Sequence, residues 1–185
     1  MKIALILSGL SLIFLKSCDT YTDKNGDKKV VVYETQSSKT ARTKDEAYEL
    51  LKQGKADEAI AILEEIESKT KTDKQVYYYL GIAYGMLEQN EKALSYSDKA
   101  IIIDSVYAGA YENRSLYNLK LGKYIQALGD IETAIRLNPT NPDAYMNKGI
   151  IAYDMNNKEG ACYNIKKAKE LGGQVPDELY KMTCE

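Results

Sequence analysis

Histidine is absent from the 185-residue sequence. Catalytic triads built on a histidine base, and most catalytic zinc or iron sites, need this side chain, so both classes are excluded. Tryptophan is absent too, and phenylalanine occurs once, which leaves sixteen tyrosines as nearly the whole aromatic content. The sequence therefore predicts a non-catalytic protein without a cofactor or a metal site, in which tyrosine fills aromatic core positions.

The chain also lacks an excess of positive charge and a hydrophobic run long enough to span a bilayer. Its formal net charge is −2, so no nucleic-acid partner is expected. The apolar run from Ile3 to Leu15 has thirteen residues, too few for a transmembrane helix, and follows the basic start Met1-Lys2. This order predicts a signal peptide over residues 1–17.

Cysteine occurs only three times. The segment Leu15-Lys16-Ser17-Cys18 resembles a bacterial lipobox, which predicts that Cys18 is lipidated and that acyl chains hold the protein on a membrane. The expected location is the cell envelope, on the periplasmic side or the surface of the outer membrane. The alternatives are a plain cleaved signal that leaves a free cysteine, or an uncleaved anchor.

The other two cysteines, Cys162 and Cys184, form an even pair in a chain predicted to be exported. Such a pair suggests a disulfide. Closing a loop of this length would stabilise the fold by roughly 3 kcal/mol in the chain-entropy model. The alternative is two unpaired thiols.

Residues 18–39 are polar and contain one short β-prone run, Val30 to Tyr33, after a turn signal at Asn25-Gly26. They predict a tether with a small hairpin. A calcium loop of the EF-hand type is the alternative, because five residues match its positions 1, 3, 5, 8 and 12: Asp23, Asn25, Asp27, Val30 and Glu34. Lys28 in place of the loop glycine, and the lack of room for a preceding helix, favour the tether.

Small residues recur every 34 positions through the rest of the chain, the length of a helix-turn-helix repeat. Three columns are in phase: Ala59, Ala93, Ala127 and Ala161; Ala47, Gly81, Ser115 and Gly149; Ile66, Ala100, Ala134 and Ala168. Two helices that cross closely need small residues where their backbones approach. The columns therefore predict four pairs of packed helices.

The repeat resembles the tetratricopeptide repeat, with units at 40–73, 74–107, 108–141 and 142–175. The third unit carries the resemblance best, through Tyr111, Leu121-Gly122, Tyr124, Ala127, Ala134 and Asn138-Pro139. The resemblance implies an all-α, right-handed superhelical solenoid. Residues 176–185 are expected to form a C-terminal capping helix, with Leu179 and Met182 on the face that covers the end of the stack.

In this family the first helix of each unit lines a concave groove that binds a protein or peptide segment. The resemblance implies these groove residues: Tyr78, Ile82, Met86, Glu112, Asn113, Leu116, Lys120, Met146, Asn147, Ile150 and Tyr153. Asn113 and Asn147 are expected to bind a peptide backbone. The alternative is that these side chains pack against neighbouring helices. Arg114 and Asp130 are expected to form an internal salt bridge.

These observations predict a membrane-anchored scaffold that resembles tetratricopeptide-repeat lipoproteins of Gram-negative bacteria and assembles proteins in the envelope. The competing hypothesis is an envelope enzyme subunit, or a calcium-responsive module that uses the Asp23 to Glu34 loop. The absence of histidine and the continuous helical period favour the scaffold.

Overall fold

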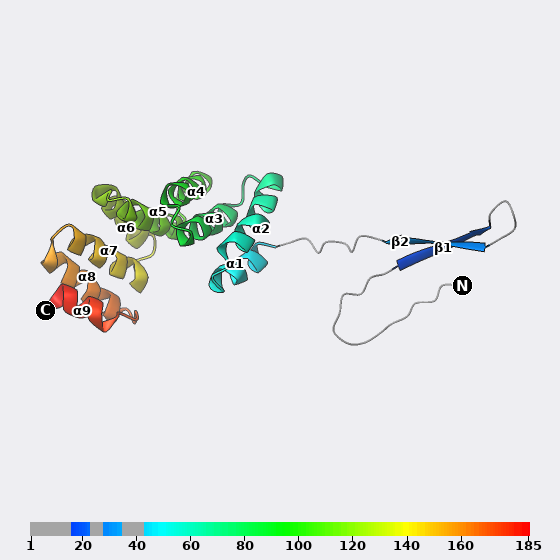
Figure 1. Cartoon of the computed structure of the whole chain (residues 1–185). Coiled ribbons are helices and arrows are strands. Elements are labelled where there is room, and N and C mark those ends of the chain that lie inside the picture. The colour runs from blue at the N-terminus through cyan, green and yellow to red at the C-terminus, as the bar shows by residue number, and fades with distance from the viewer. Residues whose placement is uncertain (1–15, 23–27, 35–42) are drawn as a thin grey trace. The chain divides into compact units, whose positions relative to one another are not determined.

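The structure is a computed structural model that describes residues 16–22, 28–34 and 43–185 (Figure 1). The chain divides into two units, residues 1–41 and 42–185, and each is described by itself. The predicted leader up to Leu15, the turn at Asn25-Gly26 and the tether residues 35–39 lie outside the described residues. Along the described part, no helix combines the length and the apolar composition that crossing a bilayer requires.

The N-terminal unit contains an antiparallel pair of strands, β1 (Lys16–Thr22) and β2 (Lys28–Glu34). Its β-branched run Val30 to Val32 lies in β2, where such side chains are favoured. In the register of the pair, Cys18 lies opposite Val32 and Thr22 opposite Lys28. Strand β1 begins two residues before the predicted boundary at Cys18, so the hairpin includes the end of the predicted leader.

The calcium alternative does not agree with this hairpin. Its positions 6 to 12 are Lys28 to Glu34, which form one continuous strand, whereas an EF-hand loop curls so that its last carboxylate reaches the ion held by its first. A strand of this length spans about 20 Å and cannot curl in this way. The other ligands that the sequence suggested, Asp23, Asn25 and Asp27, lie outside the described residues.

The C-terminal unit is helical throughout its described length, and Figure 1 shows its helices following one another as antiparallel pairs. The four pairs fall in the four predicted repeats and are followed by a single helix. Their bounds are α1 (Lys44–Lys52), α2 (Ala56–Lys69), α3 (Lys74–Met86), α4 (Asn90–Ile103), α5 (Ala108–Lys120), α6 (Tyr124–Leu137), α7 (Pro142–Asp154), α8 (Lys158–Glu170) and α9 (Asp177–Cys184).

Side-chain caps begin α3 and α7. The Asp73 carboxylate accepts a hydrogen bond from the Gln75 amide at 2.9 Å, and Asn141 Oδ1 accepts one from the Asp143 amide at 3.0 Å. Pro142 occupies the first turn of α7, where its missing N–H costs nothing. Each cap satisfies a backbone donor that the helix itself leaves unpaired.

The predicted seam between paired helices is confirmed. Ala59, Ala93, Ala127 and Ala161 have no exposed surface. Ser115 Oγ donates a hydrogen bond to the Ala127 carbonyl at 2.7 Å across the seam. A β-carbon at Gly149 would lie 3.2 Å from the Ala161 carbonyl oxygen, so the backbones of α7 and α8 approach closely only because this residue has no side chain.

The helices form two rows. The first helices α1, α3, α5 and α7 each contact the next first helix, and each second helix packs against the first helix that follows it. Apolar side chains buried between the rows form two clusters: one around Leu63, Val76 and Leu80, and one around Ile131 and Ile151. This arrangement gives the right-handed solenoid an inner face made by the first helices.

Helix α9 packs against α8, and a disulfide joins Cys162 of α8 to Cys184 of α9, with 4.7 Å between their Cα atoms. The prediction that Met182 faces the stack is wrong, since it is 47% exposed, whereas Thr183 is 4% exposed. The Thr183 hydroxyl donates to the Leu179 carbonyl at 2.8 Å. The reason is the helix phase: with Cys184 turned toward α8, its neighbour Thr183 is buried and Met182 points away.

Candidate functional site

The inner face brings the predicted groove residues together on three neighbouring helices. Met86 and Lys120 are exposed and the other nine are partly exposed. Some also pack against neighbours, as the alternative expected: Ile82 and Leu116 contact the first apolar cluster. The residues come from α3 (Tyr78, Ile82, Met86), α5 (Glu112, Asn113, Leu116, Lys120) and α7 (Met146, Asn147, Ile150, Tyr153).

Four tyrosines form a continuous row on this face, which we call the inner tyrosine row: Tyr48, Tyr79, Tyr78 and Tyr107. Their ring centroids are separated in that order by 5.1, 5.6 and 5.2 Å. The row begins on α1, crosses α3 and ends at the residue before α5. A β-carbon at Gly109 would lie 3.1 Å from the Tyr78 ring, so this glycine makes room for the row at the start of α5.

Sequence reasoning placed Tyr78 in the groove but missed Tyr79 and Tyr107. Tyr79 occupies the repeat position that is Asn113 in the third unit, which was a usable signal. Tyr107 is the last residue of its unit, and contact with Tyr78 depends on how two units stack. The row therefore extends the predicted groove toward the first repeat.

The two ends of the inner tyrosine row carry lysines of the chain itself. Lys52 Nζ lies 5.1 Å from the centroid of the Tyr48 ring, and Lys74 Nζ lies 4.9 Å from that of Tyr107. Contacts of this kind between a cation and an aromatic face are attractive. Within the described part of the chain, no lysine or arginine lies over the rings of Tyr78 and Tyr79.

The phenol hydroxyls of the row have no hydrogen-bond partner among the described residues, whereas those of Tyr84 and Tyr117 do. Burial, and then the negative charge of Glu112, raises the pKa of Tyr78 to about 12. Its hydroxyl thus stays protonated at neutral pH and can donate a hydrogen bond. The row offers a ligand both ring surface and polar groups.

Glu112 forms a partly buried acidic site beside Tyr78. Asn141 Nδ2 donates to Glu112 Oε2 at 2.8 Å, and Asn141 Oδ1 accepts a hydrogen bond from the Asp143 backbone N–H, so Asn141 connects Glu112 to the start of α7. Burial, followed by the charge of Asp143, raises the pKa of Glu112 above its ordinary value and outweighs the opposing effect of the Asn141 bond. No described cation forms an ion pair with Glu112.

Asn113 follows Glu112 on α5, and its Nδ2 atom is buried without a hydrogen-bond partner. An unmade hydrogen bond at a buried amide costs free energy, and such groups are rare in folded proteins. Asn113 is therefore a donor that the fold itself does not use.

Arg114 forms the predicted internal salt bridge. Its Nη2 lies 2.6 Å from Asp130 Oδ1 and its Nη1 lies 2.8 Å from Asp98 Oδ1, a partner that sequence reasoning missed. Lys148, sixteen residues from Glu132, pairs with it at 2.9 Å in the corresponding way. The shallow hollow of about 310 Å³ around Arg114 has its charges paired within the chain, so we assign it a structural role.

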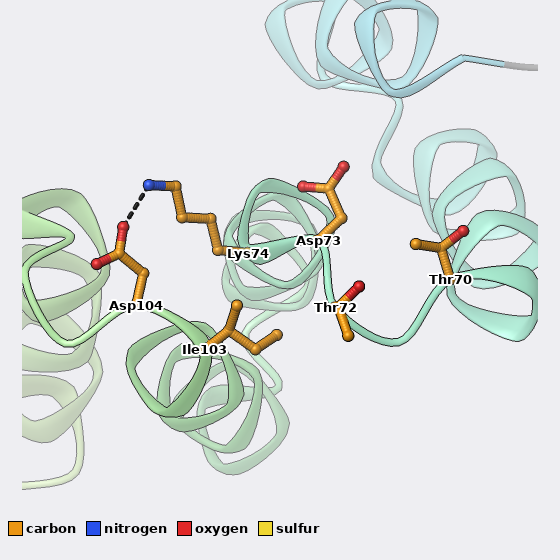
Figure 2. Close-up of a pocket in the computed structure, with 6 residues that line it drawn as sticks. All are labelled: Thr70, Thr72, Asp73, Lys74, Ile103 and Asp104. Atoms are coloured by element: carbon orange, nitrogen blue, oxygen red, sulfur yellow. Dashed lines mark hydrogen bonds and ion pairs between the residues drawn. The ribbon is translucent and has the colours of Figure 1, made fainter.

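A second hollow, of about 570 Å³, lies at the turns before α3 and α5 (Figure 2). Figure 2 shows the Lys74 side chain reaching Asp104, with which it forms an ion pair. Asp73 pairs with Lys44 at 2.8 Å. Because its charged residues Asp73, Lys74 and Asp104 form ion pairs within the chain, this hollow is not the candidate site. No three histidine, cysteine, aspartate or glutamate side chains in the described ranges are grouped to hold a metal ion.

The fold and its inner face define a helical-repeat scaffold of the class that binds proteins. A family model described as "Tetratricopeptide repeat" matches residues 44–108 and 113–174. These segments make up more than half of the chain, which belongs to the tetratricopeptide-repeat family. Proteins of this family are generally non-catalytic interaction scaffolds.

Known proteins agree with this assignment. The chain is 27% identical to human DnaJ homolog subfamily C member 7 over 105 residues, which cover 57% of this chain and 21% of the relative. It spans about a fifth or less of the length of the curated relatives it matches. The crystal structure of MamA has a TM-score of 0.63 and 26% identity, over 69% of this chain and 75% of that one. The thermophilic tetratricopeptide-repeat protein TTC0263 of Thermus thermophilus shares the fold, with a TM-score of 0.65 and 23% identity over 74% of each chain.

Proposed function

We propose that this protein is a membrane-anchored scaffold of the bacterial cell envelope that binds segments of partner proteins in the groove formed by α3, α5 and α7. The observation that carries the proposal is the set of polar groups on the inner face that have no hydrogen-bond partner among the described residues. These are the hydroxyls of the inner tyrosine row and the buried amide nitrogen of Asn113. Arg114 of α5, by contrast, is paired within the chain with Asp98 and Asp130.

An extended peptide fits this set chemically. Its backbone presents carbonyl oxygens that can accept hydrogen bonds from the tyrosine hydroxyls and from Asn113 and Asn147. Its side chains can bury apolar surface against Ile82, Leu116 and Ile150, which remain partly exposed. Binding would thus supply acceptors for donors that the free protein leaves unpaired.

The anchoring part of the proposal is supported by the sequence of the predicted leader and by Cys18. Cleavage before Cys18 would remove Lys16 and Ser17 from β1 and leave five of its seven residue pairs with β2. The lipid would then attach at the first residue of the hairpin. Several acyl chains at one cysteine suffice for stable membrane attachment.

Affinity capture from solubilised envelope membranes tests the binding function. We expect the full-length protein to retain specific partners, and the double variant Asn113→Ala/Asn147→Ala to lose them. Gln126→Ala, which removes an exposed amide from α6, is the matched control and should behave as the wild type. Equal capture by the double variant would show that the groove asparagines do not take part.

Detergent partitioning tests the anchor. We expect the wild-type protein to enter the detergent phase with the mass increase of acyl chains, and Cys18→Ala to remain unprocessed or soluble. The anchor is refuted if both proteins partition alike and neither carries added mass.

A further inference from the structure

Glu112 is a partly buried carboxylate of the inner face that has no cationic partner among the described residues. Asp73 pairs with Lys44, and Asp104 with Lys74. Glu112 receives only the neutral amide of Asn141. Lys120, the cation on the same side of α5, lies two helical turns away, or about 12 Å along the axis. A partly buried carboxylate thus remains uncompensated in the groove.

The aromatic surface beside Glu112 shows the same difference. Lysines of the chain lie over the rings of Tyr48 and Tyr107 at the two ends of the row. The Tyr78 ring lies between those ends and packs against Gly109, which is about one helical turn before Glu112 on α5. A carboxylate next to an aromatic ring attracts a cation through both charge pairing and the ring quadrupole. The Tyr78 ring therefore offers a cation the same kind of aromatic contact that Lys52 and Lys74 already make at the two ends of the row, and Glu112 adds a negative charge.

Two further groups determine what kind of molecule would bring that cation. Asp143 adds a second negative charge near Glu112: its backbone N–H binds Asn141, the residue that donates to Glu112, and its carboxylate acts on Glu112 through space. Asn113 supplies a buried donor that needs an acceptor such as a peptide carbonyl. A free metal ion or a small amine would leave this donor unsatisfied, whereas a peptide carries both the cation and the carbonyl.

We propose that the groove recognises a basic peptide segment, in which a lysine or arginine places its charge between Glu112 and Asp143 and its aliphatic stem along the Tyr78 ring. This inference rests on the proposed peptide-binding function and specifies its partner. Charge complementarity favours lysine or arginine in the bound peptide. Because Glu112 is partly buried, a peptide without a cation would leave this charge unpaired, at a cost in binding free energy.

Selection from a phage-displayed library of short random peptides tests the inference with the full-length protein. We expect the selected peptides to be enriched in lysine and arginine, and the enrichment to disappear with Glu112→Gln. In calorimetric titration, a selected peptide should bind Glu112→Gln about tenfold more weakly than the wild type. Glu112→Lys should instead select acidic peptides.

The matched control is Glu91→Gln, which changes an exposed glutamate in the first turn of α4. It should select the same basic peptides as the wild type. Peptides that depend on Asn113 and Asn147 but show no basic enrichment would overturn this inference and leave the proposed function standing. Failure of the wild type to select any groove-dependent peptide would overturn both. Helical circular dichroism establishes that each variant is folded.

Discussion

The inner tyrosine row contrasts with a second group of tyrosines on the other side of α3, which we call the outer tyrosine cluster: Tyr77, Tyr84 and Tyr96. The rings of Tyr84 and Tyr96 stack with centroids 5.3 Å apart, and those of Tyr77 and Tyr96 lie 6.2 Å apart. Lys99 lies over both Tyr77 and Tyr96. In ring geometry the two groups are therefore alike.

The two groups differ in whether their hydroxyl groups form hydrogen bonds within the described part of the chain. Tyr84 donates to Glu64 at 2.7 Å, Tyr96 to Glu67 at 3.4 Å, and Tyr77 to a backbone carbonyl at 3.3 Å. Lys99, above the rings, also pairs with Glu67 at 3.0 Å. The hydroxyls of the outer tyrosine cluster thus form hydrogen bonds within the chain, whereas those of the inner tyrosine row have no partner among the described residues. Aromatic content alone does not distinguish a core from a binding surface, but hydrogen-bond accounting does.

The largest effect should come from a change that tests which helices face inward. Ala127→Leu adds three carbons at a seam residue that has no exposed surface, and should cost about 1 to 3 kcal/mol of unfolding free energy because the helices must separate. Urea unfolding followed by helical circular dichroism measures the loss. Lys123→Leu, at an exposed residue, should cost little. Equal stability of the two variants would mean that the seam, and with it the inner face, is misplaced.

A somewhat smaller effect is expected for a substitution at Gly85 of α3, which packs against Tyr117 of α5. A β-carbon at Gly85 would lie 2.4 Å from the buried Tyr117 ring, whose hydroxyl donates to the Gly81 carbonyl at 2.9 Å. Gly85→Ala should therefore destabilise the fold by about 1 to 2 kcal/mol, despite the better helix propensity of alanine.

Gly129→Ala is the matched control for Gly85→Ala, since no atom lies within 4 Å of a β-carbon at this exposed helical position. It should stabilise the protein by up to about 1 kcal/mol. The two glycine changes are thus expected to move the urea midpoint in opposite directions. A shift in the same direction would contradict the close packing of Tyr117 on α3.

The seam could be predicted because each pair of helices needs a small residue where it crosses, and this residue recurs at the same position in every repeat. A small residue is needed at Gly81 and at Ala93 wherever the paired helices cross, so the sequence period alone identifies both. Contacts between repeats carry no such period. Asp98 of one unit binds Arg114 of the next, and Tyr78 meets Tyr107, only because of how far each unit rotates on its neighbour. The inner tyrosine row therefore could be predicted only in part.

The outer and inner tyrosines should respond differently to loss of the hydroxyl. Tyr84→Phe removes the bond to Glu64 and should cost about 1 kcal/mol of unfolding free energy. Tyr79→Phe removes a hydroxyl without a partner among the described residues and should change stability by less than about 0.5 kcal/mol. In peptide titrations the order should reverse, with Tyr79→Phe weakening binding and Tyr84→Phe leaving it unchanged. Equal effects in both measurements would remove the distinction between the two groups.

The smallest effect, a gain in stability of a few tenths of a kcal/mol or more, is expected for Glu112→Gln. Folding raises the pKa of Glu112 above its ordinary 4.5, mainly through burial. Both states are protonated below the unfolded pKa, and the folded state loses stability relative to the unfolded state as pH rises from the unfolded pKa through the folded pKa. Glutamine keeps an acceptor for Asn141 and has no charge to desolvate.

The stability advantage of Glu112→Gln over the wild type should therefore be larger at pH 7 than at pH 4, as measured by urea unfolding at both pH values. Glu91→Gln, at an exposed position, should give the same difference at both. The same variant should also lose the basic peptides. A residue kept only for the fold would not both stabilise the free protein when replaced and abolish a binding preference. An advantage that is equal at pH 4 and pH 7 would show that the Glu112 charge costs the folded state nothing, and would remove the reason to expect a cation from a partner at this site.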